Sequence, residues 1–237
     1  MAIGKEFIPL MEKIGYNFCD LSYIEKALTH SSYTNEMKNL GIRAESNETL
    51  EFLGDAVLQL CISEKLFEIY SKKGEGTLTV LRKNIVCESS LAALARNISL
   101  GEYLNVGNGD EQSGVRGSSK VLADALEALI AAIYLDDMNQ GGLNYREVIY
   151  ALFKDAINES YGKDYTDYKT ALQQFIEKNE DSELLYEVIE EKGPDHNKTF
   201  TIIALINNNI VGRGTGRTKK AAEMEAAKQA LMLFGVI

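Results

Sequence analysis

The amino-acid sequence predicts an α+β protein, in which an all-α domain over residues 1–160 precedes a small α-β-β-β-α domain over residues 164–235. Three observations support this prediction. Apolar residues recur at helical spacing from the start of the chain to about residue 160. A short polar linker follows near residues 160–164. Beyond it, alternating and β-branched runs lie between two further helical patterns.

The first part is helical segment by segment. Apolar stripes at 7–14 and 21–28 have the spacing of one helix face, and the pattern continues through longer segments at 50–70, 78–98, 121–135 and 148–157. Glycines separate these segments as expected of turns. The glycine-rich run "GEYLNVGNGDEQSGVRGSS", residues 101–119, is predicted to be a loop.

In the second part of the chain, the spacing of apolar residues changes from helical to partly alternating. A short helix is predicted at 168–179, and the alternating run 184–193 is typical of a strand. Two β-branched runs flank the asparagines 207–209, as a hairpin requires, and an alanine-rich helix covers 218–234. The order of elements favours a three-stranded sheet with two helices on one face.

Composition narrows the class of protein. The chain has 237 residues, of which 45% are hydrophobic and 25% charged, as in globular proteins. We expect no membrane span, because no apolar stretch approaches roughly 20 residues. The N-terminus lacks the pattern of a secretory signal, and the three cysteines have no zinc-site spacing, so we expect reduced thiols, with Cys61 and Cys87 in the core, and a cytoplasmic protein.

The segment "TLEFLGDAVLQL", residues 49–60, contains acids in an apolar run. In a helix, Glu48, Glu51 and Asp55 fall within an arc of roughly 60°. The surrounding residues are apolar nearly all round, so the helix is predicted to be buried. No Lys or Arg lies between positions 50 and 63 to pair with this acidic stripe.

The segment "VLADALEALIAAIYL", residues 121–135, repeats the arrangement with Asp124 and Glu127 on one face and no basic residue within it. If the two stripes face each other, the carboxylates repel and raise each other's pKa unless a cation lies between them. Mg²⁺ prefers such oxygen ligands and bridges carboxylates to phosphates, which suits phosphodiester hydrolysis. The alternative is that these acids are solvated or paired with distant arginines. Periodicity leaves both interpretations open.

Two further residues have testable structural roles. Gly54 lies inside the first acidic helix, where glycine costs up to about 1 kcal/mol relative to alanine, and the close approach of another helix would justify it. His30 stands beside Ser31 and Ser32, but no third orienting group accompanies them in the sequence. We therefore expect His30 to support packing or hydrogen bonding rather than nucleophilic catalysis.

The acidic segment "NETLEFLGDAVL", residues 47–58, resembles the signature of the ribonuclease III family, which cleaves double-stranded RNA. "ALTHSSYTNE", "SLAALARNISLGEYLNVG" and "LADALEALIAAIYLD" resemble other segments of that family in the same order, and the downstream part resembles its double-stranded-RNA-binding domain. The resemblance implies an all-α catalytic domain that works as a homodimer, with one metal-dependent site in each subunit.

The resemblance also assigns roles to residues of this sequence. It implies that Glu51, Asp124 and Glu127 bind Mg²⁺, with Mn²⁺ as a substitute. It implies catalytic roles for Asp55 and Glu127 in orienting and activating water, and an accessory role for Glu48.

The last helix begins beside a basic cluster: Arg213, Arg217, Lys219 and Lys220 are the four charged residues from 213 to 220. Lysines at a helix N-terminus oppose the helix dipole, so the arrangement favours a bound anion such as phosphate. The alternative is a basic surface turn that aids solubility. The net charge of −10 would by itself argue against nucleic-acid binding, because domains that bind phosphate are usually basic. A local basic cluster such as this one can outweigh the total charge.

The resemblance places double-stranded RNA on this domain. It implies that His196 and Lys198, in the turn between the first two strands, enter one minor groove, and that Thr170 and Gln173 of the first helix enter the next. Lys219 and Lys220 would hold phosphates between the grooves.

The predicted function is therefore an Mg²⁺-dependent homodimeric endoribonuclease for double-stranded RNA. The resemblance implies processing of ribosomal and other structured precursor RNA, with 5′-phosphate and 3′-hydroxyl products. Two other functions fit parts of the sequence: a catalytically silent RNA-binding regulator, and a carboxylate metalloenzyme for small molecules. The intact acids argue against the first, and the C-terminal domain is unexplained by the second.

Overall fold

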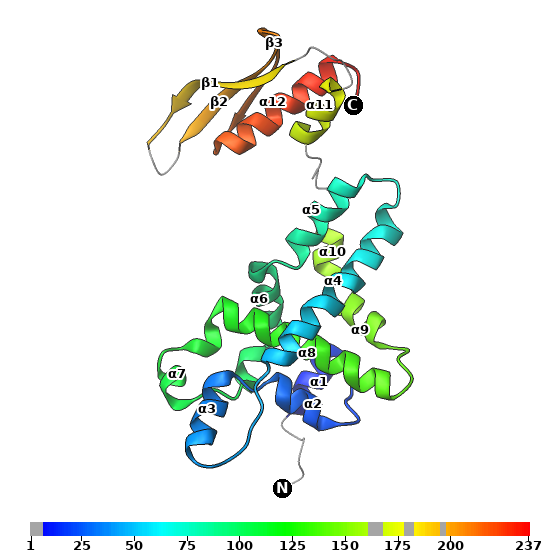
Figure 1. The fold of residues 1–237 in the computed structure, drawn as a ribbon, viewed down its shortest axis with the longest axis vertical. Coiled ribbons are helices and arrows are strands. Elements are labelled where there is room, and N and C mark those ends of the chain that lie inside the picture. Colours follow the sequence, from blue (N-terminus) through cyan, green and yellow to red (C-terminus); the bar gives the residue numbers. More distant parts are fainter. Residues whose placement is uncertain (1–6, 161–167, 178–182, 195–197) are drawn as a thin grey trace. The chain divides into compact units, whose positions relative to one another are not determined.

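The structure is a computed structural model that describes residues 7–160, 168–177, 183–194 and 198–237. The chain divides into two compact units, Met1–Lys163 and Asp164–Ile237, and each is described by itself. The predicted fold class is confirmed, since the described residues of the first unit form helices without a strand, and those of the second form an antiparallel sheet with two helices (Figure 1). In the described ranges, no helix has the length and apolar character needed to cross a membrane.

The described part of the first unit consists of α-helices joined by short turns. They are α1 Ile8–Ile14, α2 Leu21–Ala27, α3 Ser31–Asn39, α4 Glu48–Tyr70, α5 Glu75–Ile85, α6 Glu88–Asn97, α7 Asn108–Gln112, α8 Ser119–Asn139, α9 Tyr145–Leu152 and α10 Lys154–Ser160. Two short 3₁₀ helices, Leu100–Tyr103 and Val115–Gly117, precede and follow α7.

Helix α8 is the centre of this unit. Its residues from Leu126 to Ile133 are almost fully buried, apart from the partly exposed Glu127, because α2, α4 and α6 pack around it (Figure 1). Gly54 of α4 lies at the crossing with α8, where a Cβ atom on Gly54 would stand 1.8 Å from the backbone oxygen of Glu127. The close helix approach that was predicted to justify this glycine is confirmed.

Helix α4 is less buried than its composition predicts. Its core face includes Leu58, Cys61 and Ile62, but Phe52 is 82% exposed and Leu60 is 51% exposed. The prediction of burial all round was wrong for the single chain, because α8 and α9 cover one side of α4 and leave an apolar strip on another.

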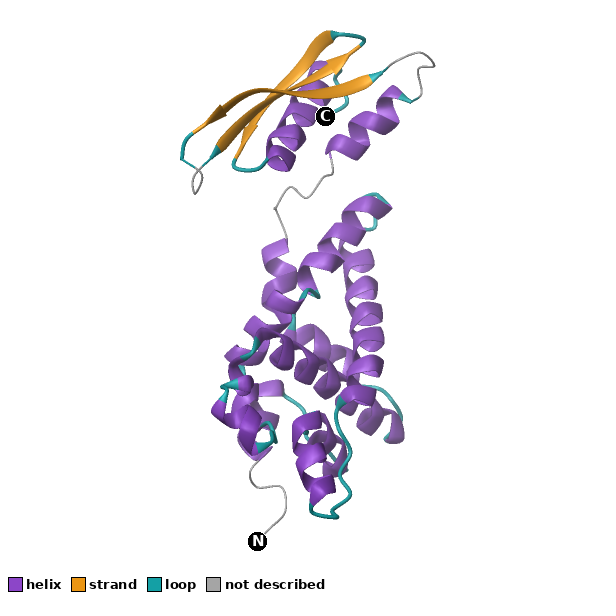
Figure 2. Cartoon of the chain, turned by 60° about the vertical axis from the view of Figure 1, so that its left-hand side comes forward, coloured by secondary structure: helices purple, strands orange, loops and turns teal. Residues whose placement is uncertain are grey.

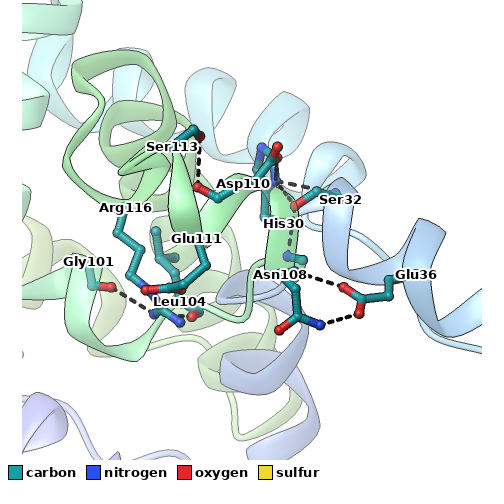
Figure 3. A network of polar contacts seen from close by, with 11 residues as sticks. His30, Ser32, Glu36, Gly101, Leu104, Asn108, Asp110, Glu111, Ser113 and Arg116 are labelled. Atoms are coloured by element: carbon teal, nitrogen blue, oxygen red, sulfur yellow. Dashed lines mark hydrogen bonds and ion pairs between the residues drawn. The ribbon is translucent and has the colours of Figure 1, made fainter.

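The segment 101–119 is not a plain loop, so that prediction was also wrong. It contains α7 and the two short 3₁₀ helices, and Arg116 holds them together by donating hydrogen bonds to the carbonyl oxygens of Gly101 and Leu104 and by pairing with Glu111 (Figure 3). These long-range contacts have no periodic pattern in the sequence. The predicted helical run 78–98 is likewise divided, into α5 and α6.

His30 has the supporting role that the sequence predicts. Its Nδ1 accepts a hydrogen bond from the backbone N–H of Ser32 at 3.3 Å, which caps the N-terminus of α3, and lies 3.7 Å from Asp110 Oδ2 (Figure 3). The cysteines are free thiols; Cys61 is buried as expected, but Cys87 is only partly buried and Cys19 is exposed.

The second unit is a three-stranded antiparallel sheet with helices on one face (Figure 2). Its described elements follow the predicted order: α11 Tyr168–Ile176, β1 Leu184–Lys192, β2 Thr199–Ile206, β3 Asn209–Gly216 and α12 Lys219–Leu233. Strand β2 is central and mostly buried, and it pairs with both neighbours. Asn207 and Asn208 have φ of 49° and 68°, the left-handed conformation of a tight hairpin turn, so the predicted asparagine turn is confirmed.

Helix α12 lies unusually close to β3. A Cβ atom on Gly212 would meet the backbone oxygen of Ala226 at 2.1 Å, and one on Gly214 would meet the oxygen of Ala222 at 2.1 Å. Small residues on both sides therefore allow the helix and strand to touch through their backbones. This contact fixes the start of α12, where the basic cluster lies.

Candidate metal centre and nucleic-acid surface

The crossing of α4 and α8 brings together three carboxylates from the two predicted acidic stripes. Oxygen atoms of Glu51, Asp124 and Glu127, which we call the carboxylate cluster, all lie within 4.8 Å of one another. Each side chain is partly buried. Glu51 lies in the first turn of α4, and Asp124 and Glu127 follow each other by one turn on α8, so the helical spacing directs both α8 acids toward α4.

The electrostatics of the cluster are unfavourable without a cation. Burial, followed by the charges of Asp55, Asp124 and Glu51, raises the pKa of Glu127 to about 7. Burial, and then the Asp124 charge, raises the pKa of Glu51, and burial also raises the pKa of Asp124. All of these effects disfavour the ionised carboxylates, and a divalent cation would relieve them.

Hydrogen bonding separates this cluster from the structural acids of the same helix. Asp136 of α8 is 1% exposed, but it accepts hydrogen bonds from the Tyr16 hydroxyl at 2.8 Å and from the backbone N–H of Asp20 at 2.8 Å. Asp137, 2% exposed, accepts a bond from the backbone N–H of Tyr145 at 3.0 Å and so caps α9. The cluster carboxylates, in contrast, accept no hydrogen bond from the described residues.

These residues fit a hard divalent cation. Oxygens that share a Mg²⁺ ion at about 2.1 Å are separated by up to about 4.2 Å, close to the spacing found in the cluster. The donor set is entirely carboxylate, which suits Mg²⁺ and Mn²⁺ rather than a thiolate- or imidazole-bound metal. The arrangement can therefore hold a metal ion beside a phosphate group.

Asp55 and Glu48 lie at the margin of the cluster. Asp55 is exposed and accepts a hydrogen bond from Gln59 Nε2 at 3.2 Å, and its charge helps to raise the pKa of Glu127. Glu48 is exposed, accepts a bond from Ser46 Oγ at 2.9 Å and lines a pocket of about 410 Å³ together with Glu51 and Asp124.

Sequence reasoning missed Lys120, which lines the same pocket. Its charge opposes the rise in the pKa of both Glu51 and Asp124, so it lies near the two acids. The predicted absence of a local cation beside the second acidic stripe is therefore wrong. Lys120 precedes Asp124 by four residues, and this i, i+4 spacing could have revealed it.

In the second unit, the predicted RNA-binding lysines meet at one end of the sheet. Lys219 Nζ lies 3.2 Å from Glu191 Oε1, and Lys198 Nζ lies 3.6 Å from Glu191 Oε2. Lys219 and Lys220 are exposed on the first turn of α12, which contains no acid and is capped by Thr218. The helix end thus presents two exposed lysines, of which Lys219 is paired with Glu191, together with backbone N–H groups that an anion could bind.

The remaining predicted RNA-binding residues come from other elements. Thr170 and Gln173 are exposed on α11, where Gln173 donates a hydrogen bond to Glu177 at 2.9 Å. Lys169 joins α11 to α12 through an ion pair with Glu223 at 2.6 Å. His196 lies outside the described residues.

Comparison with known proteins gives a consistent result for both units. Residues 20–155 match the family described as Ribonuclease-III-like, and residues 168–233 match the double-stranded RNA binding motif. A relative named Ribonuclease 3 from Caldanaerobacter subterraneus is 48% identical over 230 residues, covering 96% of this chain and 98% of that protein. Another from Streptococcus gordonii is 44% identical over 221 residues, covering 93% of each.

A solved structure resembles the first unit. The nuclease domain of ribonuclease III from Campylobacter jejuni matches with a TM-score of 0.54 and 33% identity, over 65% of this chain and 98% of that one. Each of the two family matches falls within one of the two structural units, and the relatives match both units over nearly their whole length. The chain belongs to the ribonuclease III family of endoribonucleases that act on double-stranded RNA.

Proposed function

We propose that this protein is an Mg²⁺-dependent, homodimeric endoribonuclease that cuts double-stranded RNA in ribosomal and other structured precursors in the cytoplasm, leaving 5′-phosphate and 3′-hydroxyl ends. Residues 1–160 would form the catalytic domain, and residues 164–235 would bind the RNA. The observation that carries the proposal is the meeting of three partly buried carboxylates, which accept no hydrogen bond in the described part of the chain.

The proposed site assigns a role to each acid. Glu51, Asp124 and Glu127 would hold Mg²⁺, or Mn²⁺ in its place, and the metal would supply a polarised phosphoryl oxygen and an acidified water. Asp55 and Glu127 would orient the attacking water and accept its proton. Glu48, at the pocket rim, would have an accessory role in placing the RNA.

The proposed RNA surface is formed by residues of the second unit, of which Thr170, Gln173, Lys219 and Lys220 are exposed. Thr170 and Gln173 of α11 and His196 and Lys198 between β1 and β2 would contact successive minor grooves. Lys219 and Lys220 would hold phosphates at the start of α12, where no acid occupies the first turn. Such binding reads the shape of A-form RNA more than its sequence.

Dimerisation is supported by Phe52. This side chain is 82% exposed and directly follows Glu51 of the cluster, and Leu60 continues the apolar strip at 51% exposure. Exposed aromatic side chains of this size are typical of protein interfaces. The Campylobacter jejuni nuclease domain is itself described as having a region involved in dimer formation.

The deciding experiment is cleavage of a long RNA duplex with Mg²⁺ by the parent protein and by Glu127→Gln. The amide keeps the shape of the side chain but removes one anionic ligand and proton acceptor. We expect cleavage to fall by at least about a thousandfold while duplex binding in a gel-shift assay stays within about twofold, as for loss of a group that acts mainly in the transition state. Cleavage by the variant at the parent rate would disprove the site assignment.

A further inference from the structure

Lys120 is the basic residue in the pocket beside the carboxylate cluster. This pocket, about 410 Å³, has Glu48, Glu51, Asp124, Lys120 and His30 among its lining residues. No arginine or second lysine is found among its lining residues, so Lys120 is the pocket's source of fixed positive charge in the described part of the chain.

The backbone that carries Lys120 is held in place. Arg96 of α6 donates hydrogen bonds to the carbonyl oxygen of Gly117 at 3.2 Å and to Ser119 Oγ at 2.9 Å. Ser119 is the first residue of α8, so these bonds fix the turn from which Lys120 projects. The lysine is therefore presented from a fixed helix end rather than from a free loop.

The side chain of Lys120 is exposed and available to a ligand. In the ranges that the structure describes, its ammonium group forms no ion pair with a carboxylate, although Glu51 and Asp124 are close enough for its charge to lower their pKa. Lys26, Lys65 and Lys169, in contrast, each have an acidic partner within 2.8 Å.

The negative charge around the pocket indicates what the Lys120 ammonium group could do there. Glu51, Asp124, Glu127 and nearby Asp55 together carry more negative charge than one divalent cation neutralises, so a phosphate entering the pocket would be repelled. Lys120 places a positive charge at the edge of this excess of negative charge, where it would offset the repulsion and give a phosphate a favourable contact.

We propose that Lys120 binds a backbone phosphate of the RNA duplex at the edge of the carboxylate cluster and so positions the strand for cleavage. This inference rests on the proposed function. It makes Lys120 a positioning residue whose contribution appears in substrate binding rather than in metal binding. The competing explanation is that Lys120 acts only as an internal counter-ion for Glu51 and Asp124.

The test compares Lys120→Gln, Lys120→Arg and the control Lys154→Gln, which changes an exposed lysine of α10 outside the pocket. KM and kcat are measured on a short RNA duplex at saturating Mg²⁺, and Mn²⁺ binding to the protein without RNA is measured by electron paramagnetic resonance. For Lys120→Gln, we expect KM to rise about tenfold, as for one lost phosphate contact, with kcat within about threefold of the parent. Lys120→Arg should recover most of the loss, and Lys154→Gln should match the parent.

KM separates the proposal from the counter-ion explanation, and the Mn²⁺ measurement separates it from a structural effect on the cluster. Under the proposal, Lys120→Gln binds Mn²⁺ at least as tightly as the parent, because a positive charge near the cluster has been removed. An unchanged KM would overturn the proposal and leave the counter-ion explanation, and a raised KM with weakened Mn²⁺ binding would overturn it in favour of a structural effect on the cluster. If the parent itself cuts no duplex, the proposed function fails first and the inference fails with it.

Discussion

Two kinds of buried or partly buried acid lie on α8, and their hydrogen bonds distinguish them. Asp136 and Asp137 accept bonds from backbone N–H groups at 2.8 to 3.0 Å, which stabilise their charge and tie α8 to its neighbours. Asp124 and Glu127 have no such donors in the described ranges. A charge without hydrogen bonds in a partly buried place is stabilised by a counter-ion, so the missing donors favour the proposed metal site.

The raised pKa of Glu127 predicts how the stability of the metal-free protein depends on pH. Its pKa is 4.5 ordinarily and about 7 in the fold, so between these values the folded state holds a proton that the unfolded state has released. The resulting stabilisation is complete below pH 4.5 and is lost as pH rises through about 7. We expect the free energy of unfolding in urea, with a chelator present, to be larger at pH 5.5 than at pH 8.

The control for this pH dependence is Glu127→Gln, which cannot titrate and should flatten the difference between the two pH values. Addition of Mg²⁺ at pH 8 should restore stability to the parent protein, because the ion replaces the lost proton as the neutralising charge. Greater stability at pH 8 than at pH 5.5 in the chelated parent would contradict the assigned direction of the shift.

At the scale of elements, two close backbone contacts position the functional groups. Gly54 allows α4 to approach α8, and this approach brings Glu51 to Asp124 and Glu127. Gly212 and Gly214 allow β3 to approach α12 in the second unit. In both places, the absence of a side chain on one element determines where charged side chains on the other element lie.

We expect Gly54→Ala to disrupt the α4–α8 crossing. Its Cβ atom would stand 1.8 Å from a backbone oxygen, which cannot move without moving the helix, so the helices must separate. The expected loss is at least about 2 kcal/mol of unfolding free energy, with weakened Mn²⁺ binding because the cluster opens. Both quantities can be measured by urea denaturation and by titration with Mn²⁺.

Gly76→Ala is the matched control. Gly76 is the second residue of α5 and has no atom within 4 Å of an added Cβ, so alanine there should keep or slightly raise the stability, by less than the roughly 1 kcal/mol of a helix interior. If Gly54→Ala behaved like this control, the close crossing would not exist in solution.

At the scale of the whole molecule, the chain joins an acidic catalytic unit to an RNA-binding unit with a basic end. Each unit has its own core, and the carboxylate cluster and basic surface belong to different units. Binding and chemistry should therefore be separable by mutation. The exposed apolar strip on α4 is the surface on which the proposed second copy of the chain would pack.

Lys219→Ala combined with Lys220→Ala tests the separation of binding from chemistry. Loss of two phosphate contacts should weaken binding about tenfold or more and reduce the slope of log affinity against log salt by about 1 to 2. The rate at saturating RNA should stay close to that of the parent. Filter binding at several salt concentrations measures the slope, and a parent affinity that did not change with salt would contradict the electrostatic explanation.

Phe52→Asp tests the dimer. A charge in place of the exposed aromatic ring should prevent burial of the α4 strip, so sedimentation velocity should show a shift from dimer to monomer. Leu143→Asp is the control, since Leu143 is 83% exposed but lies between α8 and α9 rather than on α4. Dimerisation of Phe52→Asp with the parent's affinity would place the interface elsewhere.

The sequence by itself determined the fold class, the order of elements in the second unit, the turn at Asn207 and Asn208, and the spacing of acids along α4 and α8. These features depend on contacts between near neighbours in the chain, which periodicity and turn propensity describe directly. The helices within 101–119 were not predicted, because Arg116 holds them through contacts that no local pattern records.

Only the tertiary structure decided that the two acidic stripes meet, that Lys120 shares their pocket and that Phe52 remains exposed. Each of these features depends on which helix faces pack together. Helical periodicity predicts which residues share a face, but it does not predict which other helix that face contacts. The backbone contact at Gly54 fixes that partner for α4, and the position of the carboxylates follows from it.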